Sequence, residues 1–317
     1  MKYGLGSRLA SLTLLAAALT FGGAAVLARA AETDHMDSQS TESQYVENMW
    51  NFVDRSMDAG QGIPENAEGV LAEIRERGVL RVATEPHFPP QEFIDESLSG
   101  QARFVGSDME LARRVAERMG VELEIVPMDF SQVLPSLEEG ECDLAISGLA
   151  YTPERAEGYE LSKGYHFASG ETGSALLIRA ENQGRLRELS DLSDKIIVAQ
   201  SSSLQEALTA ENVIYYKEFR RLRSIQEVYA AVAEGWADAA VVDAETADSY
   251  IEAHPEDGLA LAQELRFHLP FYMEGDRIAG KKGELQLLYF VNGVIDEVLE
   301  SGEYARWFRA YSQYGQA

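Results

Sequence analysis

From residue 69 to residue 243, short apolar runs alternate with amphipathic segments, and this alternation constrains the fold more than any other feature of the sequence. Strands that alternate with helices of about ten residues predict parallel sheets covered by helices on both faces. We therefore expect an α/β fold. The expected strands are 80–83, 123–126, 143–147, 174–178, 195–199 and 238–243, and the expected helices are 70–77, 108–119, 131–139, 203–209 and 224–234.

Two parts of this pattern, 142–148 and 237–243, have the same form. In each, a helix and a glycine turn lead to an acidic residue, an apolar strand and polar residues at the carboxyl end of that strand. Ligands of open α/β sheets bind beyond the carboxyl ends of the strands. We expect two lobes that present strand ends to a shared cleft, for which 317 residues are sufficient.

Charge and cysteine content exclude several classes of protein. Asp and Glu number 53 and Lys and Arg 27, a formal net charge of −26, so no nucleic-acid partner is expected. Acid excess is common in secreted and in salt-adapted proteins, and composition does not separate these causes. Cys142 is the only cysteine, which excludes an internal disulfide, and we expect it to be a small core residue. Neither glycine-rich phosphate loops nor metal-ligand spacing of histidines is present, so we expect no cofactor and no metal.

Residues 1–30 have the features of a cleaved export signal. Lys2 and Arg8 precede an uncharged run rich in Leu and Ala at 9–28, and Ala28-Arg29-Ala30 fits a signal peptidase site. The alternative is an uncleaved anchor, since about twenty apolar residues can span a bilayer. The Ala-x-Ala ending favours cleavage, and we predict a periplasmic location.

Residues 31–68 form an acidic amino-terminal extension. Apolar residues at helical spacing from Tyr45 to Met57 predict a short amphipathic helix within it. This helix either lies on the body of the protein, which we favour, or docks on a partner.

Residues beyond the strand ends suit a small zwitterion. Arg155 can bind a carboxylate through two parallel hydrogen bonds, and Asp243 offers the anionic acceptor that an ammonium needs. Ser203 begins a helix whose free N–H groups would add to an anion site. Simpler roles stay open: Arg155 could lie on a surface helix capped by Thr152, and Asp243 could cap the helix that follows it.

Several segments resemble, in order, the extracellular solute-binding proteins of family 3, the polar amino-acid receptors of ABC importers. The most diagnostic is Cys142-Asp-Leu-Ala-Ile-Ser-Gly-Leu-Ala-Tyr-Thr-Pro-Glu-Arg155, and the resemblance covers roughly 70–315. It implies a two-lobed, type II periplasmic-binding-protein fold with mixed, mainly parallel sheets and two crossing strands near 166–173 and 267–274. The implied division is lobe 1 at 69–168 and 272–317 and lobe 2 at 169–271.

The resemblance also implies roles for matched residues. Arg155 corresponds to the arginine that binds the α-carboxylate of the ligand, and Asp243 to the acid that binds the α-ammonium. Phe88 matches an aromatic residue that packs on the ligand, and Glu85 an acidic position at the pocket mouth that could instead face water. Departures from the family pattern leave the side-chain specificity open. The remaining expected site positions are Ser147, Gly148, Ala150, Tyr151, Ser202 and Ser203.

The implied function is non-enzymatic: a monomeric receptor that delivers an amino acid or related zwitterion to an ABC transporter permease. One alternative is an enzyme similar to cyclohexadienyl (arogenate/prephenate) dehydratases, in which Glu85 or His87 supplies a proton. Another is a ligand-sensing accessory subunit. His87 and His166 are the only histidines that we expect near the cleft, and we expect ordinary roles for both. The run 201–203 has no paired His/Asp motif, so a hydrolase triad is not expected.

Overall fold

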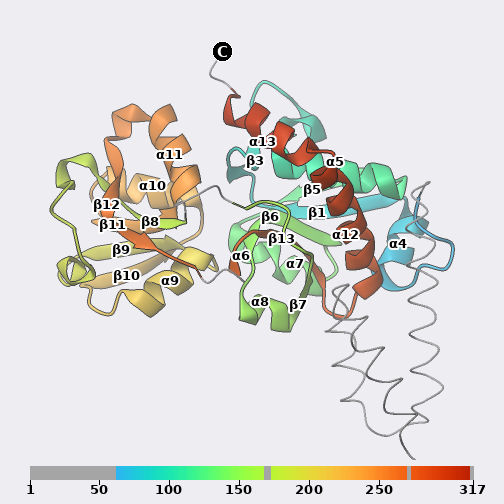
Figure 1. Ribbon diagram of the computed structural model, residues 1–317, viewed down its shortest axis with the longest axis horizontal. Helices are drawn as coiled ribbons and strands as arrows, with labels where there is room; N and C mark the ends of the chain where they lie inside the picture. The colour runs from blue at the N-terminus through green and yellow to red at the C-terminus, as the bar shows by residue number, and fades with distance from the viewer. Residues whose placement is uncertain (1–61, 168–172, 270–272, 315–317) are drawn as a thin grey trace, which may run out of the picture. The chain divides into compact units, whose positions relative to one another are not determined.

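The computed structural model (Figure 1) describes residues 62–167, 173–269 and 273–314. The export signal and the helix between Tyr45 and Met57 that the sequence predicts lie outside these residues. Within the described ranges, the chain forms two five-stranded sheets and one three-stranded sheet. No helix in these ranges has both the length and the apolar character needed to cross a membrane.

The first five-stranded sheet has the order β5-β1-β6-β13-β7. Strand β1 is parallel to β5 and β6, whereas β13 is antiparallel to both β6 and β7. We call this sheet and the elements that pack on it lobe 1. Its strands are β1 (Val79–Thr84), β5 (Glu122–Pro127), β6 (Leu144–Ala150), β7 (Tyr159–Leu161) and β13 (Asp276–Lys281), and a small sheet of β2 (His87–Phe88), β3 (Glu92–Ile94) and β4 (Phe104–Val105) accompanies it.

The second sheet repeats this arrangement in the order β10-β9-β11-β8-β12. Strand β9 is parallel to β10 and β11, whereas β8 is antiparallel to β11 and β12. In each sheet the fourth strand therefore runs against the other four, which confirms the mixed, mainly parallel α/β fold. We call this sheet and the elements packed on it lobe 2. Its strands are β8 (Ser174–Arg179), β9 (Ile196–Gln200), β10 (Glu218–Leu222), β11 (Ala239–Asp243) and β12 (Leu259–Phe267).

Lobe 2 has a separate apolar core on each face of its sheet. Ala175 and Leu177 of β8 pack with α10 (Ile225–Ala233) and α11 (Ala244–Ala253). Leu176 and Ile178 belong to the other core, to which α9 (Leu204–Asn212) contributes. Successive strand residues point to opposite faces, so a strand covered on both sides is apolar throughout. This explains the uninterrupted apolar run at 175–178.

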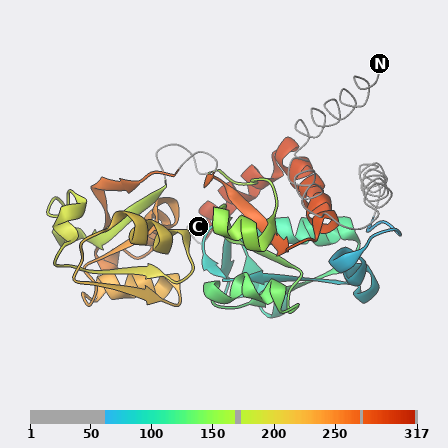
Figure 2. The same ribbon diagram turned by 90° about the horizontal axis from the view of Figure 1, so that it is seen from below.

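Lobe 1 includes the carboxyl-terminal helices. Helix α5 (Ser107–Met119) contacts β1, β5 and β6, and α12 (Leu285–Glu300) and α13 (Glu303–Ser312) contact α5, as Figures 1 and 2 show. Ion pairs of 2.8 Å join Arg114 to Glu303 and Arg118 to Glu297. The helices α12 and α13 thus pack on lobe 1. The other helices of lobe 1 are α4 (Gly69–Arg77), α6 (Phe130–Val133), α7 (Pro135–Glu138) and α8 (Pro153–Gly158).

The single helix expected at 131–139 is wrong: the segment forms α6 and α7, separated at Leu134. Pro135 explains the break, because proline lacks the N–H that would continue the hydrogen-bond ladder. Cys142 is buried in the core between these helices and the first sheet, as expected. The exact lobe boundaries stay a prediction, because 168–172 and 270–272 lie outside the described residues.

Candidate functional site

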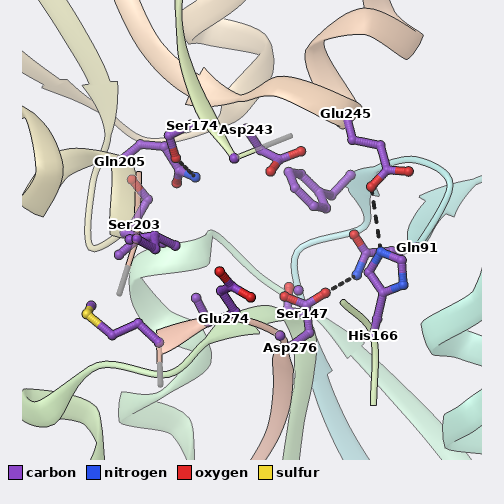
Figure 3. Close-up of a pocket in the computed structure, with 18 of the residues that line it drawn as sticks. Gln91, Ser147, His166, Ser174, Ser203, Gln205, Asp243, Glu245, Glu274 and Asp276 are labelled. Carbon is purple, nitrogen blue, oxygen red and sulfur yellow. Dashed lines mark hydrogen bonds and ion pairs between the residues drawn. The ribbon is translucent and has the colours of Figure 1, made fainter. Parts of the chain in front are cut away.

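A cavity of about 220 Å³ is lined by both lobes. Lobe 1 contributes the carboxyl ends of β1 and β6, and lobe 2 those of β9 and β11 (Figure 3). Two hydrogen bonds cross between the lobes here: Gln200 Nε2 donates to Glu85 Oε2 at 2.7 Å, and Arg155 Nη2 donates to the Ser202 carbonyl at 3.0 Å. The cavity therefore lies where the strand ends of an α/β sheet place a ligand.

Arg155 is positioned by the helix cap that precedes it. Thr152 Oγ1 accepts a hydrogen bond from Arg155 N at 3.1 Å, and Pro153 occupies the first turn, so α8 begins here. The guanidinium donates through Nη1 to the Ala150 carbonyl at 2.7 Å and through Nη2 to lobe 2, and only 8 % of Arg155 is exposed.

The Arg155 guanidinium forms no ion pair with any carboxylate of the described residues. Its hydrogen-bond acceptors there are two backbone carbonyl oxygens. Burial lowers the pKa of Arg155 to about 10, which leaves it charged at neutral pH. A buried cation without an anion is costly. A bound carboxylate would offset that cost.

Asp243 lies at the end of β11 and lines the cavity. Its Oδ1 accepts a hydrogen bond from Thr246 N at 2.9 Å, so it caps α11, the simpler role that the sequence left open. Burial raises the pKa of Asp243, although the Thr246 hydrogen bonds oppose the shift. The same carboxylate thus caps a helix and faces the cavity, and its role toward an ammonium stays a prediction.

Glu85 is enclosed rather than solvent-facing. It is 4 % exposed, so the expectation that it could face water at the pocket mouth is wrong. One oxygen accepts from Gln200, whereas Oε1 is buried without a hydrogen-bond partner in the described chain. Burial raises the pKa of Glu85 to about 7, with the Gln200 hydrogen bond acting in the opposite direction.

Ser147 and Gly148 lie on β6 in the cavity wall. Ser147 Oγ accepts from Glu85 N at 3.0 Å and donates to Glu92 Oε1 at 3.2 Å, so the hydroxyl already has protein partners. Gly148 has φ 52°, and a Cβ there would lie 3.2 Å from the Phe88 ring, which also lines the cavity. Glycine therefore lets this aromatic ring lie against the strand.

The remaining expected positions divide into two groups. Ala150 and Ser203 line the cavity, and Ser203 caps α9 by accepting a hydrogen bond from Glu206 N at 3.0 Å. Tyr151 and Ser202 do not line it, and their expected contact with a ligand stays a prediction. Ser202 has φ 64° in a tight turn that directs its carbonyl, not its side chain, toward Arg155. Tyr151 follows Ala150, and neighbouring residues of an extended chain point to opposite sides.

The cavity also contains polar residues that were not among the expected ligand-binding positions. Asp276 begins β13 and accepts a hydrogen bond from Gln91 Nε2 at 2.8 Å. His166 Nε2 lies 3.7 Å from Glu245 Oε2, the second residue of α11 (Figure 3). His166 begins the first predicted crossing segment and Asp276 lies two residues beyond the second, where no strand or helix pattern marks a site. Polar side chains in those segments were the only available signal.

Histidine placement also differs from the expectation. His268 lines the cavity and His87 does not, so naming His87 and His166 as the only histidines near the cleft is wrong. His166 stacks on Phe308 with ring centroids 4.3 Å apart. Burial lowers the pKa of His166, but the neighbouring carboxylates of Glu245 and Asp276 outweigh it, and the net shift is upward.

Acidic groups dominate the wall of the cavity. Its one guanidinium, Arg155, and two imidazoles, those of His166 and His268, share the wall with six carboxyl groups. Burial raises the pKa of Glu85, Glu92, Asp243 and Asp276, so the potential away from Arg155 becomes more negative as these groups ionise. Such a potential favours a ligand that also carries a positive group. Metal binding has no comparable support: within the described ranges, no group of three His, Cys, Asp or Glu side chains is placed to hold an ion. The six acids are Glu85, Glu92, Asp243, Glu245, Glu274 and Asp276.

Two α/β lobes of matching strand order, with a polar cavity between their strand ends, define the class of type II periplasmic binding proteins. The sequence profile of the bacterial extracellular solute-binding proteins, family 3, matches residues 80–314. The chain belongs to this family, as its motifs indicated.

Similar proteins agree with this assignment. The L-cystine-binding protein TcyJ of Escherichia coli is 27% identical over 80% of this chain and 91% of its own length. The amino acid ABC transporter substrate-binding protein AbpA from Streptococcus pneumoniae, solved bound to L-arginine, has a TM-score of 0.69 and 29% identity, and the match covers 76% of this chain and 98% of that structure. An ancestral amino-acid-binding protein, AncCDT-1, described as a precursor of cyclohexadienyl dehydratase, has a TM-score of 0.65 and 27% identity over 77% of this chain and 99% of its own.

Proposed function

We propose that the protein binds an α-amino acid in this cavity and delivers it to the permease of an ABC importer. The observation that carries this proposal is the Arg155 guanidinium, which is buried, held by two carbonyls and without an anionic partner among the described residues. An α-carboxylate bound there would supply that partner. Asp243 then receives the α-ammonium from the side of lobe 2.

The ligand side chain extends toward Glu85 in this proposal. The unpaired Oε1 of Glu85 is an acceptor that a cationic or hydrogen-bond-donating side chain would satisfy. Because the similar AbpA was solved bound to L-arginine, basic amino acids are the first candidates. A thermal-shift screen of L-arginine, L-histidine, L-glutamine and L-cystine, with L-glutamate as an acidic comparison, ranks the candidates. A ligand present at 100 times its Kd adds about 2.7 kcal/mol of stability.

Replacement of Arg155 tests the carboxylate site. We expect Arg155→Ala to weaken binding of the best amino acid by about 2–5 kcal/mol, because the ligand carboxylate would be buried without its partner. Titration calorimetry measures the affinity, and circular dichroism checks that the variant is folded. Arg185→Ala, at an exposed position, is the matched control and should bind like the unchanged protein. Unchanged affinity in Arg155→Ala would show that the carboxylate binds elsewhere.

We infer that binding is not followed by a chemical reaction. Glu85, with a pKa of about 7, favours the dehydratase alternative, since a general acid needs a pKa near the working pH. The similar AncCDT-1 is described as an amino-acid-binding protein rather than as an enzyme. Incubation with arogenate or prephenate separates the two functions: formation of an aromatic product would refute the receptor-only assignment.

We further propose that the protein is exported, cleaved after Ala30, and works as a periplasmic monomer with the lobe division at 69–168 and 272–317 against 169–271. The Ala28-Arg29-Ala30 sequence supports the cleavage site. Mass spectrometry of the protein recovered from a periplasmic extract should give a chain that begins at Ala31. A chain that retains residues 1–30 in the membrane fraction would favour the anchor instead.

A further inference from the structure

Two acidic side chains reach the cavity from different lobes. Asp243 ends β11 in lobe 2, and Asp276 begins β13 in lobe 1. Both line the cavity, and Figure 3 shows them on opposite sides of it. Sequence motifs indicated Asp243 alone, so the function proposed above leaves Asp276 without a role.

The Asp276 carboxylate has fewer partners than its position requires. Oδ2 accepts one hydrogen bond, from the neutral Gln91 amide, while Oδ1 has no hydrogen-bond partner among the described residues. Asp276 forms no ion pair with a Lys or Arg of the described chain, and a carboxylate so placed gains from a cation. The charged or titratable groups that surround it are His166, Asp108, Asp243, Glu92, Arg155, Arg277, Tyr165 and Tyr304.

We propose that Asp276 is a second ammonium-binding carboxylate, so that the ligand α-ammonium is bound by one acid from each lobe, Asp243 and Asp276. This inference rests on the proposed amino-acid function and adds a specificity-determining residue to it. A primary ammonium has three N–H donors and can bond to both acids at once. A quaternary ammonium has no N–H donor, so the paired acids select against betaine-type ligands.

The protein binds a different number of protons with and without its ligand. Burial raises the pKa of Asp276 to about 7, with the Coulombic effect of His166 opposing the shift and that of Asp108 reinforcing it. Near pH 7 a substantial fraction of empty molecules therefore carries a neutral Asp276. An ammonium favours the ionised form, so binding releases protons. Affinity should rise as the pH increases toward 7 and level off above it, by at most about tenfold per pH unit for one proton.

Asp276→Asn tests this arrangement, because asparagine retains an oxygen to accept the Gln91 hydrogen bond and removes only the charge. The probe is whichever of L-arginine, L-histidine, L-glutamine and L-cystine binds most tightly. At pH 8 we expect at least about a tenfold loss of affinity. Between pH 5.5 and 8 we expect a flatter affinity profile than in the unchanged protein. The preference for the probe over its Nα-trimethyl derivative should also shrink.

Glu264→Gln is the matched control. It makes the same chemical change on β12, at an exposed residue away from the cavity lining, and should leave both affinity and pH profile unchanged. Calorimetry in two buffers of different ionisation enthalpy measures the protons released, which Asp276→Asn should reduce.

The outcomes separate this inference from the function on which it rests. If none of the four amino acids binds, or if Arg155→Ala binds normally, the proposed amino-acid site is wrong and the inference falls with it. If Asp276→Asn binds like the unchanged protein, the amino-acid site stands and the second carboxylate is refuted. A loss of affinity with an unaltered pH profile and unaltered proton release also refutes it, because Asp276 would then act through shape and not charge.

Discussion

A carboxyl group enclosed in protein with one oxygen unpaired, as in Glu85, opposes folding whenever it is ionised. The sign follows from its pKa, which burial raises to about 7 in the folded chain. The unfolded chain ionises at lower pH, so the stability that Glu85 contributes is present in acid and is lost as the pH rises toward 7. A ligand that donates to Oε1 reverses that loss.

Glu85→Gln should therefore raise the melting temperature of the ligand-free protein at pH 8 and change it little at pH 5. An amide cannot ionise, and its oxygen can still accept from Gln200. Differential scanning calorimetry at the two pH values measures the effect, with Glu264→Gln as the exposed control. A stabilisation that is equal at both pH values would refute the assigned shift in the pKa of Glu85.

Site residues at the ends of predicted strands could be identified from the sequence, whereas site residues in the segments that connect the elements could not. Arg155 and Asp243 each follow an apolar run that is visible in one contiguous stretch of sequence. Asp276 and Gln91 are 185 positions apart, and only the return of the chain to lobe 1 brings their side chains together. Contacts of that kind depend on the tertiary path and leave no local pattern.

The start of α5 shows how one element is fixed against its neighbour. Gly106 precedes this helix with φ 123°, and a Cβ there would lie 2.1 Å from the Gln91 carbonyl oxygen. Asp108 N donates to the same carbonyl at 2.9 Å. The close approach of these two backbone segments therefore requires glycine.

We expect Gly106→Ala to destabilise the protein by about 3 kcal/mol, through backbone strain combined with a clash against main-chain atoms that cannot move aside. Gly78→Ala is the comparison, because Gly78 ends α4 at φ 71° with no other atom within 4 Å of an added Cβ. Its cost should be about 1 kcal/mol, from the left-handed backbone alone. Urea denaturation followed by circular dichroism compares them, and equal losses would contradict the steric argument.

Some elements with strong periodicity were predicted well, whereas strands with mixed composition and the helices α11, α12 and α13 were not predicted. The expected helix 108–119 is α5 within one residue, and the expected strand 174–178 is β8 within one residue. Strands β12 and β13 were not predicted, because Gln263, Glu264 and Arg266 interrupt the first and Arg277 and Gly280 the second. Their pairing with β8 and β6 decides that these segments are extended.

At the scale of the whole molecule, the excess of acidic residues makes stability depend on salt. With a formal charge of −26 over 317 residues, the negative side chains repel one another in the folded state. Exposed ion pairs such as Arg220–Glu218 offset little of this repulsion. Salt should therefore stabilise the fold regardless of whether the acidity reflects secretion or a saline habitat.

We expect the melting temperature to rise between 20 mM and 500 mM NaCl, because the Debye length falls from about 20 Å to about 4 Å over this range. Differential scanning fluorimetry of the ligand-free protein measures it. KCl should give the same curve as NaCl if general screening is the cause. A melting temperature that falls with salt would show that attractive pairs outweigh the net repulsion.

The position of β13 determines when the cavity comes into existence. A chain made from its amino terminus supplies β1, β5, β6 and β7 early, but the strand between β6 and β7 arrives only with residues 276–281. All strands of the second sheet lie within 174–267, so the lobe that begins later can complete its sheet first. Asp276 belongs to the strand that arrives last. The ligand-binding surface is therefore assembled only after residues 276–281 have been made, and a chain that stops before residue 276 lacks both the complete first sheet and that carboxylate.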